Sequence, residues 1–185
     1  MGLRFSPRKF WKNTRGVTAI EFAMVAPVFF FAMGAVVETG LMLYNEYVLQ
    51  SSVQEAARKI RTGQAQLAGM NAGTFKTQIC SLANAAMDCD GKVKVYVKSA
   101  ATFAALKAAI PSYLNVGTSY GGQPSYTSYD CGGPSVPVAV IATYDWNIVL
   151  PFMSAFGNVN NDKIRRIAGV AMFMNEPFPS GTNCS

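Results

Sequence analysis

The chain has 185 residues, of which half are hydrophobic and only 14% are charged, a low charge content for a protein solvated by water over its whole surface. Five of its 16 lysines and arginines lie in the first sixteen residues, namely Arg4, Arg8, Lys9, Lys12 and Arg15. Removing these five leaves 11 cations against 10 acids, so the net charge of +6 belongs to one short tail and not to a nucleic-acid-binding surface.

Two further features of the composition argue against an enzyme. The chain has no histidine, which removes Ser-His and Cys-His nucleophiles, histidine bases and histidine-ligated zinc. Its aspartates are scattered at positions that suit turns and strand ends, and its Gly-Gly pairs lack the spacing of a phosphate-binding loop. We therefore expect no catalytic residue, no cofactor, no metal and no small-molecule substrate.

Residues 1–16 form a basic leader, and a long apolar segment follows. From Val17 to Tyr44 the only charged side chains are Glu21 and Glu38. A membrane span needs about 20 apolar residues, so this segment is long enough to cross a bilayer. The cations on its N-terminal side predict a cytoplasmic N-terminus, with everything after Tyr44 outside. We expect Glu38 to mark the outer edge of the span.

Glu21 is the residue that argues against two simple interpretations of this segment. A secretory signal peptide could be cleaved near Ala32-Met33-Gly34, but the apolar stretch continues past that point and a signal peptide needs no Glu21. In a plain uncleaved anchor, nothing would explain why a carboxylate that is costly to place in the bilayer stands at position 21. A carboxylate in the membrane is expensive and indicates a functional site.

The helix is predicted to continue beyond the membrane, so that residues 17–62 form one hydrophobic helix with an amphipathic end. An apolar stripe recurs at helical spacing through Leu49, Val53, Ala56 or Ala57, and Ile60. Cations in the last turn and Gly63 after it predict the C-terminus of the helix. Pro27 lies in the middle of the span and is expected to kink the helix there.

Residues 63–185 are predicted to be an exported α+β domain. The expected elements are a loop over 63–73, helices over 74–87 and 102–110, a long loop over 115–137 rich in Gly, Ser, Tyr and Pro, and strands over 92–98, 138–149 and 163–175. Thr74 is the expected N-cap of the first helix. The alternation in the first strand places its lysines on a solvated face. The result is a small antiparallel sheet of about three strands packed on one or two helices.

Four cysteines lie beyond the apolar segment: Cys80, Cys89, Cys131 and Cys184. None forms a CxxC pair, and an even number in an exported segment predicts two disulfides in an oxidising compartment. Three pairings are possible. We favour Cys80–Cys89 and Cys131–Cys184, since each closes a local loop or ties down the C-terminal tail.

Several strings in the sequence resemble a known family. Gly16 is followed by VTAIEF, which places Glu21 five residues after a glycine, between a basic leader and a long apolar helix. This layout resembles the prepilin-peptidase site of type IV pilin-like proteins, cut after the glycine. The strings RGVTAIEFAMVAP, SSVQEAARKIR, YDWNIVLP and FMNEPF resemble the TadE-like minor pseudopilins of the tight-adherence (Tad/Flp, type IVc) pilus system. The last string contains Asn175, Glu176, Pro177 and Phe178.

The resemblance implies a pilin-like fold and cleavage between Gly16 and Val17. It implies a minor pilin that helps to start, cap or decorate a pilus, and hence a role in surface adhesion. The implied partners are the membrane, a prepilin peptidase, the major pilin, other minor pilins and the pilus assembly platform. The implied location is a bacterial inner membrane, with the exported domain periplasmic or extracellular, or incorporated in a pilus. The alternatives are an uncleaved membrane-anchored scaffold and an exported binding domain freed by signal peptidase.

Cleavage would also explain Glu21. It would create an α-amine at Val17 and remove the five cations, so that the new N-terminus could enter the lipid. There the amine could pair with the Glu21 carboxylate of a neighbouring subunit, because neither charge is tolerated alone in hydrocarbon. Glu21 and Phe22, at the motif, are therefore the expected assembly residues.

Overall fold

The computed structural model describes residues 16–83, 87–89, 92–110, 128–157, 159, 163–179 and 184. Its elements are α2 (Val17–Arg61), α3 (Gln64–Leu67), α4 (Ala72–Ala83), β1 (Val93–Ser99), α5 (Phe103–Ala109), β2 (Pro137–Asn147), the 3-10 helix η3 (Pro151–Phe156) and β3 (Ile164–Met174). The α+β class is confirmed. The chain forms two units, residues 1–37 and 38–185, and α2 runs through the boundary between them.

The described part of the first unit is the N-terminal portion of α2. In the part of the chain that the structure describes, α2 is the helix long and apolar enough to cross a membrane, with a mean hydropathy of 2.1 over its most apolar stretch. None of that stretch is buried by protein. α2 stays helical on both sides of Pro27, and a kink there stays a prediction. A long apolar helix with nothing covering it fits a membrane anchor.

The second unit is built on a three-stranded antiparallel sheet, as the sequence predicted, and its strand order is β1-β2-β3. The register pairs Val97 with Val140 and Ile141 with Val170. The central strand β2 is buried from Pro137 through Tyr144. A strand that is buried on both faces shows an almost continuous apolar run instead of alternation, which is why β2 reads PVAVIATY.

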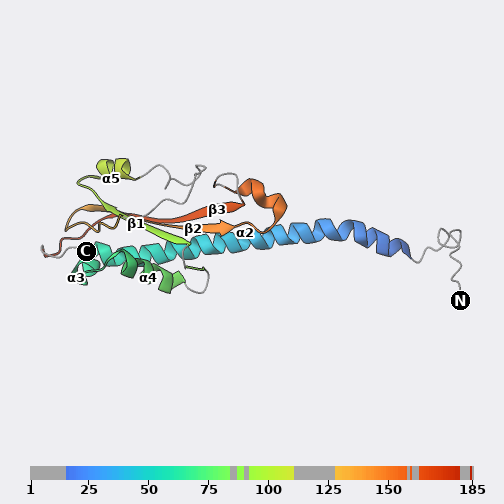
Figure 1. Ribbon diagram of the computed structural model, residues 1–185, viewed down its shortest axis with the longest axis horizontal. Coiled ribbons are helices and arrows are strands. Elements are labelled where there is room, and N and C mark those ends of the chain that lie inside the picture. Colours follow the sequence, from blue (N-terminus) through green and yellow to red (C-terminus); the bar gives the residue numbers. More distant parts are fainter. Residues whose placement is uncertain are drawn as a thin grey trace. The chain divides into compact units, whose positions relative to one another are not determined.

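One face of the sheet packs against α4 and the C-terminal part of α2 (Figure 1). The predicted apolar stripe of α2 is confirmed, because its members are all buried in this core: Leu49, Val53, Ala56, Ala57 and Ile60. Gly169 allows the helix to approach β3 closely. A Cβ there would lie 3.0 Å from the Leu49 carbonyl oxygen and 3.0 Å from Val53 Cγ2, which is too close for ordinary packing.

The opposite face is covered in part by α5 (Figure 1). Tyr96 packs there with Ile141, and its hydroxyl donates to the Ala109 carbonyl at 3.2 Å. Tyr96 shares its face of β1 with the lysines, which the alternation placed on a solvated face, yet Tyr96 itself is buried. Alternation separates the two faces of a strand but does not say what covers each of them.

The outer edge of β3 is closed by glutamine side chains of α2. The Gln50 amide accepts a hydrogen bond from Val170 N at 2.8 Å and donates to Val170 O at 2.9 Å. Gln54 donates to the same carbonyl at 3.1 Å. These amides take the place of a neighbouring strand, which protects an edge that could otherwise pair with another chain.

Two local predictions need correction, and two others concern residues that the structure does not describe. The expected loop over 63–73 contains the short helix α3, which the sequence did not indicate. α4 begins at Ala72 and its N-terminal cap is Asn71, which exchanges hydrogen bonds of 2.9 Å with Thr74, so Thr74 is not the N-cap. Two of the expected features, the end of that helix toward Met87 and most of the loop over 115–137, lie outside the described residues.

Candidate processing and assembly site

The predicted processing site lies at the start of α2. Val17 is the first residue of the helix, and Gly16 precedes it at an exposed position. A peptidase acting after Gly16 would therefore leave a chain that is helical from its first residue. The leader over 1–15 lies outside the described residues.

Glu21 and Phe22 are both exposed on the first turns of α2. Within the described part of the chain, Glu21 has no hydrogen-bond or ion-pair partner. Isolated in hydrocarbon, such a carboxylate would be costly, so any partner it has there must come from outside the described residues. The predicted amine at Val17 stays a prediction.

Glu38 has a role that the sequence did not reveal. Its side chain is buried, with only 8% of the residue exposed, and its two carboxylate oxygens accept hydrogen bonds from Val149 N at 2.5 Å and Leu150 N at 3.1 Å. The expectation that it merely marks the edge of the span is therefore incomplete. Its partners are more than 100 residues away, so no local pattern could have found them. The contact ties α2 to the turn after β2.

We expect Glu38→Ala to destabilise the second unit by about 2–3 kcal/mol, because two backbone N–H groups would lose the acceptor of their hydrogen bonds. Urea unfolding of the full chain in detergent measures this loss. Amide exchange at Val149 and Leu150 should accelerate at the same time. Glu46→Ala removes an exposed carboxylate from the same helix and is the control. Equal effects of the two substitutions would contradict the role of Glu38.

The C-terminal motif holds the other end of α2. Asn175 is buried, and its amide nitrogen donates to the carbonyls of Cys131 and Gly133, each at 2.9 Å. Glu176 N donates to the Arg61 carbonyl at 2.9 Å, which satisfies one of the carbonyls left open where α2 ends. β3 ends before the motif, so Pro177 lies outside the sheet as expected.

The ring of Phe178 leaves no room for a side chain at Gly63, the glycine that follows α2. Gly63 has a left-handed φ of 78°, which favours glycine, and a Cβ there would lie 2.8 Å from the Phe178 ring. The motif residues Glu176 and Phe178 thus contact the chain at the end of α2.

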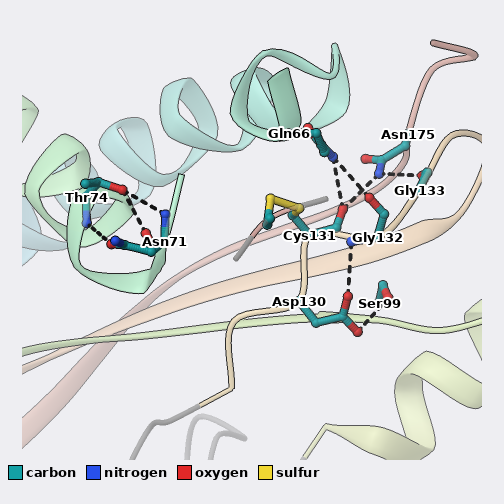
Figure 2. The surroundings of a disulfide bond; sticks show 10 residues. Gln66, Asn71, Thr74, Ser99, Asp130, Cys131, Gly132, Gly133 and Asn175 are labelled. Carbon is teal, nitrogen blue, oxygen red and sulfur yellow. Dashed lines mark hydrogen bonds between the residues drawn. A yellow bond between two sulfur atoms is a disulfide. The ribbon is translucent and has the colours of Figure 1, made fainter. Parts of the chain in front are cut away.

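Both predicted disulfides are present with the favoured pairing, Cys80–Cys89 and Cys131–Cys184. Figure 2 shows the surroundings of Cys131, whose carbonyl also accepts a hydrogen bond from the buried Gln66 side chain at 3.2 Å. Asp130 supports the same loop, since its carboxylate accepts from Ser99 Oγ at 2.7 Å and from Gly132 N at 3.2 Å (Figure 2). Two amides and a disulfide thus fix one loop between α3 and the C-terminal segment.

The described residues offer no set of groups that resembles a catalytic or metal site. No three acidic or cysteine side chains gather there as potential metal ligands. A hollow of about 340 Å³ is lined by apolar and hydroxyl side chains and by Glu55, and the hydrogen bond from Arg58 lowers the pKa of that exposed carboxyl. Burial raises the pKa of Tyr129 to about 12, with its ring packed on Phe75. Neither shift creates an acid or base that works near neutral pH.

The features described so far define a class of protein: a small disulfide-bonded α+β unit that follows an uncovered apolar N-terminal helix. Residues 16–58 match the model of a family described as TadE-like protein, which confirms the resemblance predicted from the sequence. The match begins at the predicted processing site and includes Glu21 and Glu38, but not the C-terminal motif. No curated protein and no solved structure matches the chain.

Proposed function

We propose that this protein is a minor pilin or pseudopilin of a tight-adherence pilus, held in the bacterial inner membrane before assembly. The observation that carries the proposal is the family match over residues 16–58, which includes the apolar stretch of α2 that is not buried by protein. The TadE-like family is associated with pili and is structural, not enzymatic. In this proposal the N-terminus is cytoplasmic, the second unit is exported, and adhesion is the outcome of pilus formation.

In this proposal a prepilin peptidase cuts between Gly16 and Val17. The new amine at Val17 and the carboxylate of Glu21 then meet between neighbouring subunits, and Phe22 packs beside them. Each charge is costly in lipid without the other, so the pair favours subunits in one register. The other partners are the major pilin, further minor pilins and the assembly platform.

The mass of the protein extracted from membranes tests the processing step. Loss of residues 1–16 is the expected result. A full-length chain would indicate the alternative, an uncleaved membrane-anchored scaffold of the pilus or secretion apparatus. Loss through about Gly34 would instead indicate an exported binding domain released by signal peptidase.

Glu21→Ala tests the assembly step separately. We expect cleavage after Gly16 to be largely unchanged and pilus formation to be strongly reduced, because the amine at Val17 would have no counter-charge in the membrane. Cleavage is measured by N-terminal sequencing and assembly by the amount of sheared surface pili. Glu46→Ala, which removes an exposed carboxylate of the same helix beyond the apolar segment, is the matched control. Normal assembly with Glu21→Ala would exclude the charge-pairing mechanism and leave the family match intact.

A further inference from the structure

The turn between β2 and β3 exposes large apolar side chains. Val149 is 78% exposed, and Phe152 and Phe156, both in η3, are 50% and 58% exposed. The described residues 148–157 of this turn contain no charged side chain. A compact group of exposed aromatic and branched side chains in one turn indicates a contact surface.

Glu38 fixes the turn to α2 at a defined position along the helix. Its carboxylate holds Val149 N and Leu150 N directly, within the second unit. Glu38 lies in the apolar stretch Val17–Tyr44, where the sequence predicts the outer edge of the span, so the turn is bonded to a residue at that edge. From Glu38 to the end of the stretch at Tyr44 the helix rises about 9 Å, against about 5–7 Å for the interfacial layer on each side of a bilayer. If the span ends between these two residues, the turn lies at the depth of the interfacial layer.

Cations border the apolar turn where β3 begins. The Lys163 carbonyl accepts a hydrogen bond from Ile148 N at 2.7 Å, and Lys163 is exposed. Arg165 Nη1 donates to the Phe156 carbonyl at 3.1 Å, which places its guanidinium beside η3. Apolar rings bordered by lysine and arginine are the composition of surfaces that bind anionic lipid headgroups.

We propose that this turn is a second membrane contact of the protein. Val149, Phe152 and Phe156 enter the interfacial layer of the leaflet on the exported side, and Lys163 and Arg165 face the phosphates of acidic phospholipids. The proposal rests on the membrane anchoring proposed above. Lipid is the occupant because the turn is bonded to Glu38, at the predicted outer edge of the span, whereas a protein partner would have to be recruited there.

Photo-cross-linking in vesicles tests this contact. Benzoylphenylalanine replaces Phe152 or Phe156 in the full chain, reconstituted in equimolar phosphatidylcholine and phosphatidylglycerol, and mass spectrometry detects lipid adducts. The same replacement at Phe103, an equally exposed ring on α5, is the matched control. We expect at least about fivefold more adduct at the two turn positions, because only a ring in the interfacial layer contacts acyl chains. Yields equal to that of Phe103 would overturn the proposal, as would cross-linked dimers of the chain without lipid adducts.

Phe29 separates this inference from the anchoring on which it rests. It lies in the apolar segment, so benzoylphenylalanine there must form lipid adducts if that segment is in the membrane. Adducts at Phe29 without adducts at the turn would refute the second contact alone. Absence of adducts at Phe29 would refute the anchoring as well.

The charged part of the surface has its own test. In the double variant Lys163→Gln and Arg165→Gln, adducts at Phe152 should decrease in vesicles that contain phosphatidylglycerol and stay unchanged in pure phosphatidylcholine. An equal decrease in both, or no decrease in either, would overturn the role of the two cations in binding acidic headgroups.

Discussion

Asp145→Ala should destabilise the second unit by about 3–5 kcal/mol, because it removes a charged, hydrogen-bonded partner from a buried arginine. Asp145 and Arg166 are directly paired across β2 and β3, and their side chains are only 13% and 6% exposed. The two hydrogen bonds between guanidinium and carboxylate are 2.6 and 2.9 Å long. Guanidinium-induced unfolding of the full chain in detergent, followed by near-ultraviolet circular dichroism, measures the loss.

The ion pair between Glu55 and Arg58 provides the control. It also joins a carboxylate and a guanidinium, at 2.8 Å, but the side chains are 47% and 60% exposed. Glu55→Ala should therefore cost less than about 0.5 kcal/mol. Adding Arg166→Met to Asp145→Ala should recover most of the stability, since the buried charge is then gone as well. A small effect of Asp145→Ala, or no recovery in the double variant, would show that burial of the arginine is not the cause.

Replacing Cys131 and Cys184 together by serine should lower the free energy of unfolding by about 4 kcal/mol. The bond joins residues 53 apart in the sequence, and the loop-closure entropy that it removes from the unfolded chain grows with that separation. The Cys80–Cys89 bond spans only 9 residues, so its removal should cost about 2.5 kcal/mol. The matched pair of double serine variants, unfolded in detergent under the same conditions, gives both values.

The prediction is tested by which of the two double serine variants loses more free energy of unfolding. A larger loss for the Cys80 and Cys89 variant would mean that native contacts, not loop length, dominate the stabilisation. Amide exchange adds a structural readout. The hydrogen bond from Glu176 N to the Arg61 carbonyl should stay protected without the Cys131–Cys184 bond, because Asn175 still holds the segment through the Cys131 and Gly133 carbonyls.

Much of the candidate site was accessible from sequence because its signals are local. The start of α2 at Val17, its end before Gly63 and its buried stripe follow from apolar periodicity and from the conformational preference of glycine. The three strands were recognisable from alternation or from unbroken apolar runs, and each of their ends differs from the prediction by one or two residues. The string around Gly16 and Glu21 suggested the family that the comparison then matched.

What the sequence could not show are contacts between distant residues. Asp145 had been assigned to a turn or strand end, yet it pairs inside the sheet with Arg166. α3 was missed because its four residues carry too little periodicity to distinguish a helical turn from a loop.

The amino-acid sequence by itself determined that this protein has an apolar N-terminal helix, a three-stranded antiparallel sheet and two disulfides outside the apolar segment. Those properties depend on composition and on spacings of two to four residues. Only the tertiary structure decided that Glu38 holds the turn after β2 and that Asn175 and Phe178 pack at the end of α2. A buried polar group needs a partner, and folding selects that partner from residues far away in the chain.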